Sequence, residues 1–316
     1  MKKNFTFLPF HFKQLSFKLT TKMTSLLLGS SMLLFALHSQ AQVEKKPKLV
    51  FSDVTKRSAL SLQLGGNVFF GDLGGNSGTG RPFIKDINLQ TTRLFVGAGY
   101  SYFPLRWLSI NGDLHFTGVT SADSLVDAKL GHAFGRYQRN LSSQSFIYEL
   151  QTTAQFYPLQ FINKKSTTRL MPYVGTGIGL FHFNPKAKLN GQFYYLKPLH
   201  TEGEGFAEYP ERENYHLTQF YIPFTVGVGY RLNENNLISV NAIFRKTFTD
   251  YIDDASTTYV DPSLFDKYLS AYAANIAKQL YYRGISSSTP RTNDYRGYAG
   301  NDSYTSVFIT FTHLLK

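Results

Sequence analysis

The alternation of apolar and polar residues at every second position constrains this chain more than any other feature of its sequence. In the stretch 108–118, LSINGDLHFTG, one face carries Leu108, Ile110, Leu114 and Phe116 and the other face is polar. A period of two is typical of a β-strand between two different environments. Eight stretches follow this pattern: 60–71, 93–103, 108–118, 146–157, 170–183, 217–231, 237–249 and 304–315.

The lengths of these stretches and of their connections indicate how the strands are arranged. Each stretch is long enough for a tilted membrane strand of about 9 to 11 residues. Short connections such as PLRW and LNENN alternate with long ones, and aromatic residues gather near the strand ends. Brief turns at one end and extended loops at the other are typical of outer-membrane barrels. The pattern predicts an all-β fold, an eight-stranded antiparallel transmembrane β-barrel with long outer loops, at residues 59–316. A soluble ligand-binding barrel, with its apolar residues pointing inward, is the alternative.

The amino terminus predicts export. Residues 1–41 contain five lysines and no acidic residue. Within them, an apolar run of 13 residues at 25–37 is followed by the small residues Ser39 and Ala41, as at a cleavage site. This organisation is typical of a signal peptide, and the run is shorter than the roughly 20 residues of a spanning helix. We expect residues 42–58 to be a periplasmic segment.

Charge and cysteine content narrow the possible partners. Removing the five leader lysines leaves 28 basic and 21 acidic residues, a net charge of about +7. The basic residues are scattered, so we expect outer-membrane lipid and not nucleic acid as the partner. The chain has no cysteine, which excludes disulfides and thiol chemistry.

Polar residues on the inward face of the strands predict a charge network in the lumen. An eight-stranded barrel is filled by its own side chains, so inward charges must pair with each other. We expect Arg245 to pair with Glu149 or Asp113. A catalytic pair of Asp113 with His115 is the functional alternative, although no nucleophile or third ligand stands at a recognisable spacing.

The stretch 245–261, RKTFTDYIDDASTTYVD, concentrates acidic residues at the end of a strand. Asp250, Asp253 and Asp254 offer hard oxygen ligands for calcium, but the spacing lacks the ordered pattern of a calcium loop. We expect these carboxylates to emerge into water and to cap turns or pair with basic loop residues. No other metal or cofactor site is predicted.

The last outer loop contains a helical pattern. Phe265, Leu269, Tyr272, Ile276 and Leu280 follow helical spacing. Asp261 is expected as the N-cap, with Pro262 as the first helical residue and Gly284 beyond the end. One outer loop should therefore carry a helix whose apolar stripe packs on the barrel mouth or on other loops.

Three segments carry a family resemblance: MPYVGTGIGLFHFNPKAKLNGQFYYLKPLHTEGEG, YIPFTVGVGYRLN and RKTFTDYIDDASTTYVD. They resemble an outer-membrane barrel family of Bacteroidota that includes PorG, an accessory component of the type IX secretion system. The resemblance spans most of the chain after residue 41 and is strongest over 172–261. It implies an eight-stranded barrel in the cell outer membrane, without enzyme activity or cofactor. For PorG it also implies association with a periplasmic ring of the lipoprotein PorK and its partner PorN.

These observations favour a non-enzymatic scaffold or accessory component of an envelope complex, with type IX secretion as its specific version. The basic turn at Asn163, Lys164 and Lys165 is the expected periplasmic docking surface. A narrow channel for small solutes is the alternative, and it requires a lumen that Arg245 and its partners do not plug.

Overall fold

The described residues all belong to the second of the two units of the computed structural model, Val50–Lys316. These residues are 54–74, 89–126, 133–162, 169–284, 290, 292, 294–298 and 300–315. The expected signal peptide therefore lies outside the described residues, as does most of the segment that should follow it.

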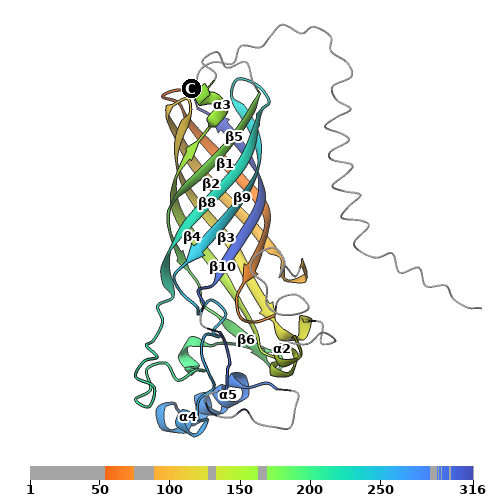
Figure 1. Cartoon of the computed structure of the whole chain (residues 1–316), viewed down its shortest axis with the longest axis vertical. Coiled ribbons are helices and arrows are strands. Elements are labelled where there is room, and N and C mark those ends of the chain that lie inside the picture. Colours follow the sequence, from red (N-terminus) through yellow and green to blue (C-terminus); the bar gives the residue numbers. More distant parts are fainter. Residues whose placement is uncertain are drawn as a thin grey trace, which may run out of the picture. The chain divides into compact units, whose positions relative to one another are not determined.

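Eight strands of the second unit form one closed barrel (Figure 1). They are β1 (Ser58–Phe70), β2 (Arg93–Leu105), β3 (Leu108–Ala122), β4 (Ser142–Phe156), β5 (Leu170–His182), β8 (Thr218–Arg231), β9 (Asn236–Thr247) and β10 (Ser303–Leu314). Each strand pairs antiparallel with its neighbours, and β1 pairs with β10 from Ala59 opposite Leu314 to Phe70 opposite Ser303. The predicted all-β barrel and all eight predicted strands are confirmed.

The outer surface of the barrel is an apolar belt. Along β4 the outward-facing residues include Tyr148 and Leu150, which are more than half exposed. The inward-facing residues Ile147 and Glu149, which alternate with them, are buried. The same alternation places Val226 and Val228 of β8 outside. A closed sheet with an apolar exterior satisfies every backbone group within a bilayer, so this is a membrane-spanning barrel of the outer-membrane type.

The two ends of the barrel differ. The end that carries the C-terminus, the two-residue turn between β2 and β3, and α3 (Pro158–Ile162) is called the turn end (Figure 1). At the turn end the rings of Trp107, Phe156 and Phe161 contact one another, with centroids 5.5–5.9 Å apart. The opposite end is called the loop end. In outer-membrane barrels the short turns face the periplasm, so the loop end faces outward.

The long loops fold together at the loop end. We call the described residues of 71–74, 123–141, 183–217 and 248–302 the loop domain. Its elements are η3 (Asp123–Leu125), α2 (Ala133–Arg139), β6 (Lys186–Leu189), β7 (Gln192–Tyr195), η4 (Lys197–Leu199), α4 (Ser263–Tyr268) and α5 (Ala271–Tyr281), and η2 (Leu89–Thr91) lies just before β2. Phe206, Phe265, Ala277 and Leu280 belong to one buried cluster. The loops therefore have a hydrophobic core of their own.

The helix predicted in the last loop is two helices, which corrects the expectation of one. α4 ends at Tyr268, and Ser270 begins α5 by accepting a hydrogen bond from the amide of Ala273 at 3.3 Å. Pro262 is the N-cap of α4, and Asp261, one position earlier, accepts from the amide of Ser263 at 2.9 Å. A serine that can cap favours a new helix start over continuation.

The break also changes which residues are buried. Phe265, Ile276 and Leu280 are buried in the loop core, whereas Tyr272 is 67% exposed and lies off the apolar stripe. Among the described residues, no helix is both long enough and apolar enough to cross a membrane.

Candidate functional site

A fully buried ion pair crosses the lumen from β9 to β4. The Nε atom of Arg245 lies 2.9 Å from Oε1 of Glu149, and Nη1 of Arg245 donates to the Ser306 hydroxyl at 2.9 Å. The guanidinium also lies over the rings of Phe95 and Tyr304, at 5.4 and 4.9 Å from their centroids. Charge, hydrogen bonds and aromatic faces together replace the water that this arginine gives up.

The pair continues into a chain of polar side chains. Nδ1 of His115 lies 2.9 Å from Glu149, and its Nε2 lies 3.0 Å from Oε1 of Gln63. Gln63 donates to one oxygen of Asp113 at 2.9 Å, and Gln151 donates to the other at 3.1 Å. Of the two partners expected for Arg245, the structure joins Glu149 to it directly and Asp113 indirectly, through the side chains between Asp113 and Glu149.

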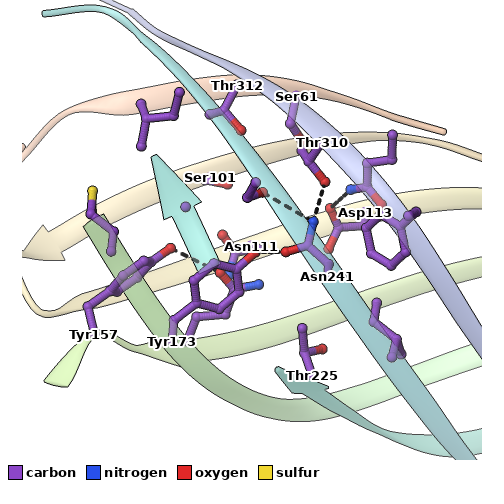
Figure 2. Close-up of a pocket in the computed structure, with 18 of the residues that line it drawn as sticks. Ser61, Ser101, Asn111, Asp113, Tyr157, Tyr173, Thr225, Asn241, Thr310 and Thr312 are labelled. Atoms are coloured by element: carbon purple, nitrogen blue, oxygen red, sulfur yellow. Dashed lines mark hydrogen bonds between the residues drawn. The ribbon is translucent and has the colours of Figure 1, made fainter. Parts of the chain in front are cut away.

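A small polar cavity lies beside this chain (Figure 2). Its volume is about 60 Å³, room for about four waters at 10–15 Å³ each. Ser61, Asn111, Asp113, Tyr173 and Asn241 are among the residues that line it. The cavity is polar and too small for a solute of metabolite size.

Buried apolar side chains pack in the lumen towards both ends of the barrel. Towards the turn end, Phe103, Tyr157 and Leu237 belong to one buried cluster. Towards the loop end, Phe181 and Tyr221 belong to another. Such a lumen is a packed core and not an open path.

The arrangement gives no support to the catalytic alternative. His115 faces Glu149 and Gln63, and Asp113 accepts from two amides, so the two do not contact as an acid–base pair. Asp113 and His115 are both buried in the lumen, at 6% and 4% exposed.

The loop domain contains a second ionic network, around Arg296. Its Nη1 atom lies 3.0 Å from Glu202, and its Nη2 atom lies 3.6 Å from Asp254. Asp254 also accepts from the hydroxyl groups of Thr201 and Tyr215, at 2.5 and 2.7 Å. This arginine ties the loop after β9 to the loop that joins β5 and β8.

A third group, which we call the aspartate cluster, consists of Asp72, Asp250, Asp253 and Asp302. Backbone amides donate hydrogen bonds to some of its carboxylate oxygens: the amide of Leu73 donates to Asp253 at 3.0 Å and the amide of Ile252 donates to Asp302 at 2.8 Å. One oxygen each of Asp250 and Asp302 is buried without a hydrogen-bond partner. Within the described part of the chain, none of the four forms an ion pair with a lysine or arginine.

Burial dominates the ionisation of the aspartate cluster. It raises the pKa of Asp250 to about 8 and that of Asp72 to about 6. It also raises the pKa of Asp253 and of Asp302 well above the usual range, and the neighbouring carboxylates add to the increase. Burial therefore favours the protonated form at Asp250, Asp253 and Asp302, whereas Asp72, with a pKa of about 6, is mostly ionised at neutral pH.

The expectation that Asp250, Asp253 and Asp254 emerge into water is wrong. Asp253 and Asp254 are 2% and 0% exposed, and Asp250 is half-buried, because the loops fold over them. The three do not form one ligand set, since Asp254 belongs to the Arg296 network. Among the described residues, no group of three or more His, Asp or Glu is arranged to hold a metal ion.

Sequence reasoning missed most of the loop contacts. Arg139 forms two 2.8 Å hydrogen bonds with the carboxylate of Asp123, and Glu202 pairs with Arg296 from 94 positions away. No periodic signal marks such pairs. His115, in contrast, stands two positions from Asp113 on the inward face, so the alternation alone indicated it. The expected docking turn, Asn163 to Lys165, lies outside the described residues.

The closed strands, the apolar belt and the plugged lumen define an outer-membrane β-barrel protein. Residues 114–282 match the family model described as Domain of unknown function (DUF6089). Because this match covers more than half of the chain, the protein belongs to that family. No curated protein matches the sequence.

Solved outer-membrane barrels are similar in fold at low identity. Ail, the attachment invasion locus protein of Yersinia pestis, in complex with sucrose octasulfate, is 8% identical over 83% of this chain and 99% of its own, with a TM-score of 0.38. Neisserial surface protein A is 8% identical over 82% and 97%, with a TM-score of 0.36. OprG from Pseudomonas aeruginosa is 10% identical over 83% and 97%, with a TM-score of 0.33. At these TM-scores, the assignment of the fold rests on the strand pairing of this chain.

Proposed function

We propose that this protein is a non-conducting, non-enzymatic outer-membrane anchor that holds an envelope complex in place, and that it serves type IX protein secretion in this way. The observation that carries the anchor role is the lumen, in which the Arg245–Glu149 pair and the rings above and below it leave room for a few waters. A barrel filled in this way offers a complex a rigid anchor and binding surfaces, and it offers solutes no path across the membrane.

The secretion role draws support from the resemblance of 172–261 to the barrel family that includes PorG. The partner in this proposal is a periplasmic lipoprotein ring, which meets the barrel at its turn end. The basic turn at Asn163, Lys164 and Lys165 is the docking surface, because short turns face the periplasm and two adjacent lysines suit an acidic partner.

Affinity purification from detergent-solubilised outer membranes tests this proposal. Exchange of Lys164 and Lys165 for Glu should reduce co-purification of the ring lipoprotein while the barrel still inserts, as judged by heat-modifiable migration on gels. A matched control exchanges Lys267 and Lys278 of the loop domain for Glu and should leave co-purification unchanged. Equal recovery of the lipoprotein with both double variants would count against the docking role.

Planar-bilayer recording separates the anchor from the narrow channel. The filled lumen predicts no single-channel conductance for the purified protein. Discrete conductance steps that persist after the exposed loops are digested away would favour the channel instead.

A further inference from the structure

The β6–β7 hairpin extends the outer face of the barrel at the loop end (Figure 1). β6 continues the sheet from β4, with Lys186 opposite Gln144. One face of the hairpin packs inward, since Ala187 is buried in the loop core together with residues of α5. The other face is continuous with the lipid-facing side of β4.

This outer face combines two lysines with two aromatic rings. We call these four residues the lysine–aromatic ledge: Lys186, Lys188, Phe193 and Tyr195. Phe193 and Tyr195 are 45% and 54% exposed. The amine of Lys186 lies 5.1 Å from the ring centroid of Phe193, and that of Lys188 lies 5.7 Å away. Cation–π contacts thus hold both amines over a ring without neutralising them.

The position of the ledge along the membrane normal follows from the outward-facing residues of β4. Phe146 is the last exposed ring among them towards the loop end, and it stacks on Phe116 with centroids 5.6 Å apart. Aromatic rings at the edge of an apolar belt sit at the membrane interface. The Lys186 amine lies 5.0 Å from the Phe146 ring centroid, on the side of β4 that leads out of the belt. The ledge is therefore at the level of the lipid headgroups.

Among the described residues, no carboxylate pairs with the lysines of the ledge. The segment 184–201 contains three lysines and no acidic residue. Lys267 and Lys278 elsewhere in the loop domain pair with Glu208 and Asp266 at 2.5 Å, whereas in the described part of the chain neither lysine of the ledge pairs with a carboxylate.

A third cation stands beside the ledge. Arg283 donates to the backbone carbonyl of Lys188 at 3.1 Å and to the hydroxyl of Ser142 at 3.3 Å. These contacts keep its guanidinium next to β6 at the outer edge of β4. Three positive charges thus stand close together at headgroup level.

We propose that the lysine–aromatic ledge binds the phosphate groups of a phosphorylated glycolipid in the outer leaflet. Headgroup phosphates supply the negative charge that the described residues do not offer to the ledge, and the acyl chains continue onto the apolar belt below Phe146. The rings of Phe193 and Tyr195 pack against the sugar part of the headgroup. Such binding fixes the rotation of the barrel relative to specific lipids, and it does not depend on a role in secretion.

Native mass spectrometry of the full chain, delipidated in detergent and titrated with lipid A, tests the proposal. Diphosphoryl lipid A should bind more tightly than the same lipid after phosphatase treatment. Exchange of Lys186 and Lys188 for Gln should weaken binding of the diphosphoryl form about thirtyfold, because each lysine near an anionic surface contributes about fivefold in affinity. The Lys186→Arg, Lys188→Arg double variant should retain binding.

A control variant and a competition experiment complete the test of lipid binding. The Lys267→Gln, Lys278→Gln double variant loses the same two charges away from the belt and should bind as the wild type does. Inorganic phosphate at millimolar concentration should not displace the lipid. Equal binding by the Lys186→Gln, Lys188→Gln variant, equal binding of the dephosphorylated lipid, or displacement by free phosphate would each overturn the assignment.

Discussion

The barrel lumen and the loop domain both bury carboxylates, and they neutralise them by different means. In the lumen, Glu149 has the guanidinium of Arg245 at 2.9 Å and the ring of His115 at 2.9 Å. In the aspartate cluster of the loop domain, amides and hydroxyls take the place of cations, and two oxygens have no partner.

The difference follows from what surrounds each region. The lumen lies at the depth of the hydrocarbon, where an unpaired charge is expensive and water is scarce, so the network carries its own counter-charge. The loop domain lies outside the membrane, where protons exchange with bulk water. Protons can therefore neutralise the carboxylates of the aspartate cluster.

Removal of the lumen carboxylate should affect the whole barrel. Glu149→Ala leaves Arg245 buried without its partner, and breaking a buried pair in this way costs about 3–5 kcal/mol. Urea unfolding in lipid vesicles measures the loss. The exposed Glu213→Ala is the matched control, and replacement of both members, Glu149→Leu with Arg245→Met, should recover most of the stability. An unchanged midpoint for Glu149→Ala would show that the pair is not structural.

Removal of the loop arginine should act locally. Arg296→Met leaves Glu202 and Asp254 buried without their cation, which destabilises the loop domain by about 3 kcal/mol. Limited proteolysis should cut the loop domain faster, while the barrel keeps its heat-modifiable migration. Lys278→Met, at an exposed pair, serves as the control. Loss of the folded barrel in Arg296→Met would mean that the two regions unfold as one unit.

The aspartate cluster should make the loop domain pH-dependent. Carboxylates whose pKa is raised on folding stabilise the folded state at low pH and lose that contribution as pH rises through the folded-state pKa. For Asp72 and Asp250 these values are about 6 and about 8, so protease resistance of the loop domain should fall between pH 5 and pH 9. The barrel strands should show no such change. Resistance that increases with pH would contradict the assignment.

Neutralising one member of the cluster should have the smallest effect. Asp302→Asn keeps an oxygen that can accept from the Ile252 amide and removes one negative charge. The stabilisation of the loop domain should be larger at pH 9, about 1 kcal/mol, than at pH 5, because burial raises the pKa of the native carboxyl and its charge appears only as the pH rises. Proteolysis at the two pH values measures this. Equal effects at both would exclude charge repulsion as the cause.

The same contrast explains how much could be predicted from the sequence. Within the strands a period of two assigns each residue to one face, so the inward positions of Glu149 and Arg245 and the outward position of Val240 follow from the alternation. Within the loops no such rule applies. Burial of Asp254 depends on Arg296, 42 positions later, and on Tyr215, 39 positions earlier. Such contacts depend on the tertiary fold, which residue spacing does not encode.

Closure of the sheet by β1 and β10 also restricts how another polypeptide can be recognised. Strand addition, in which an extended peptide pairs with an exposed backbone edge, requires a strand whose amides and carbonyls are unpaired on one side. The eight barrel strands have neighbours on both sides. Among the described strands of this sheet, the outer edge of β7 is the place where a partner's strand can be added.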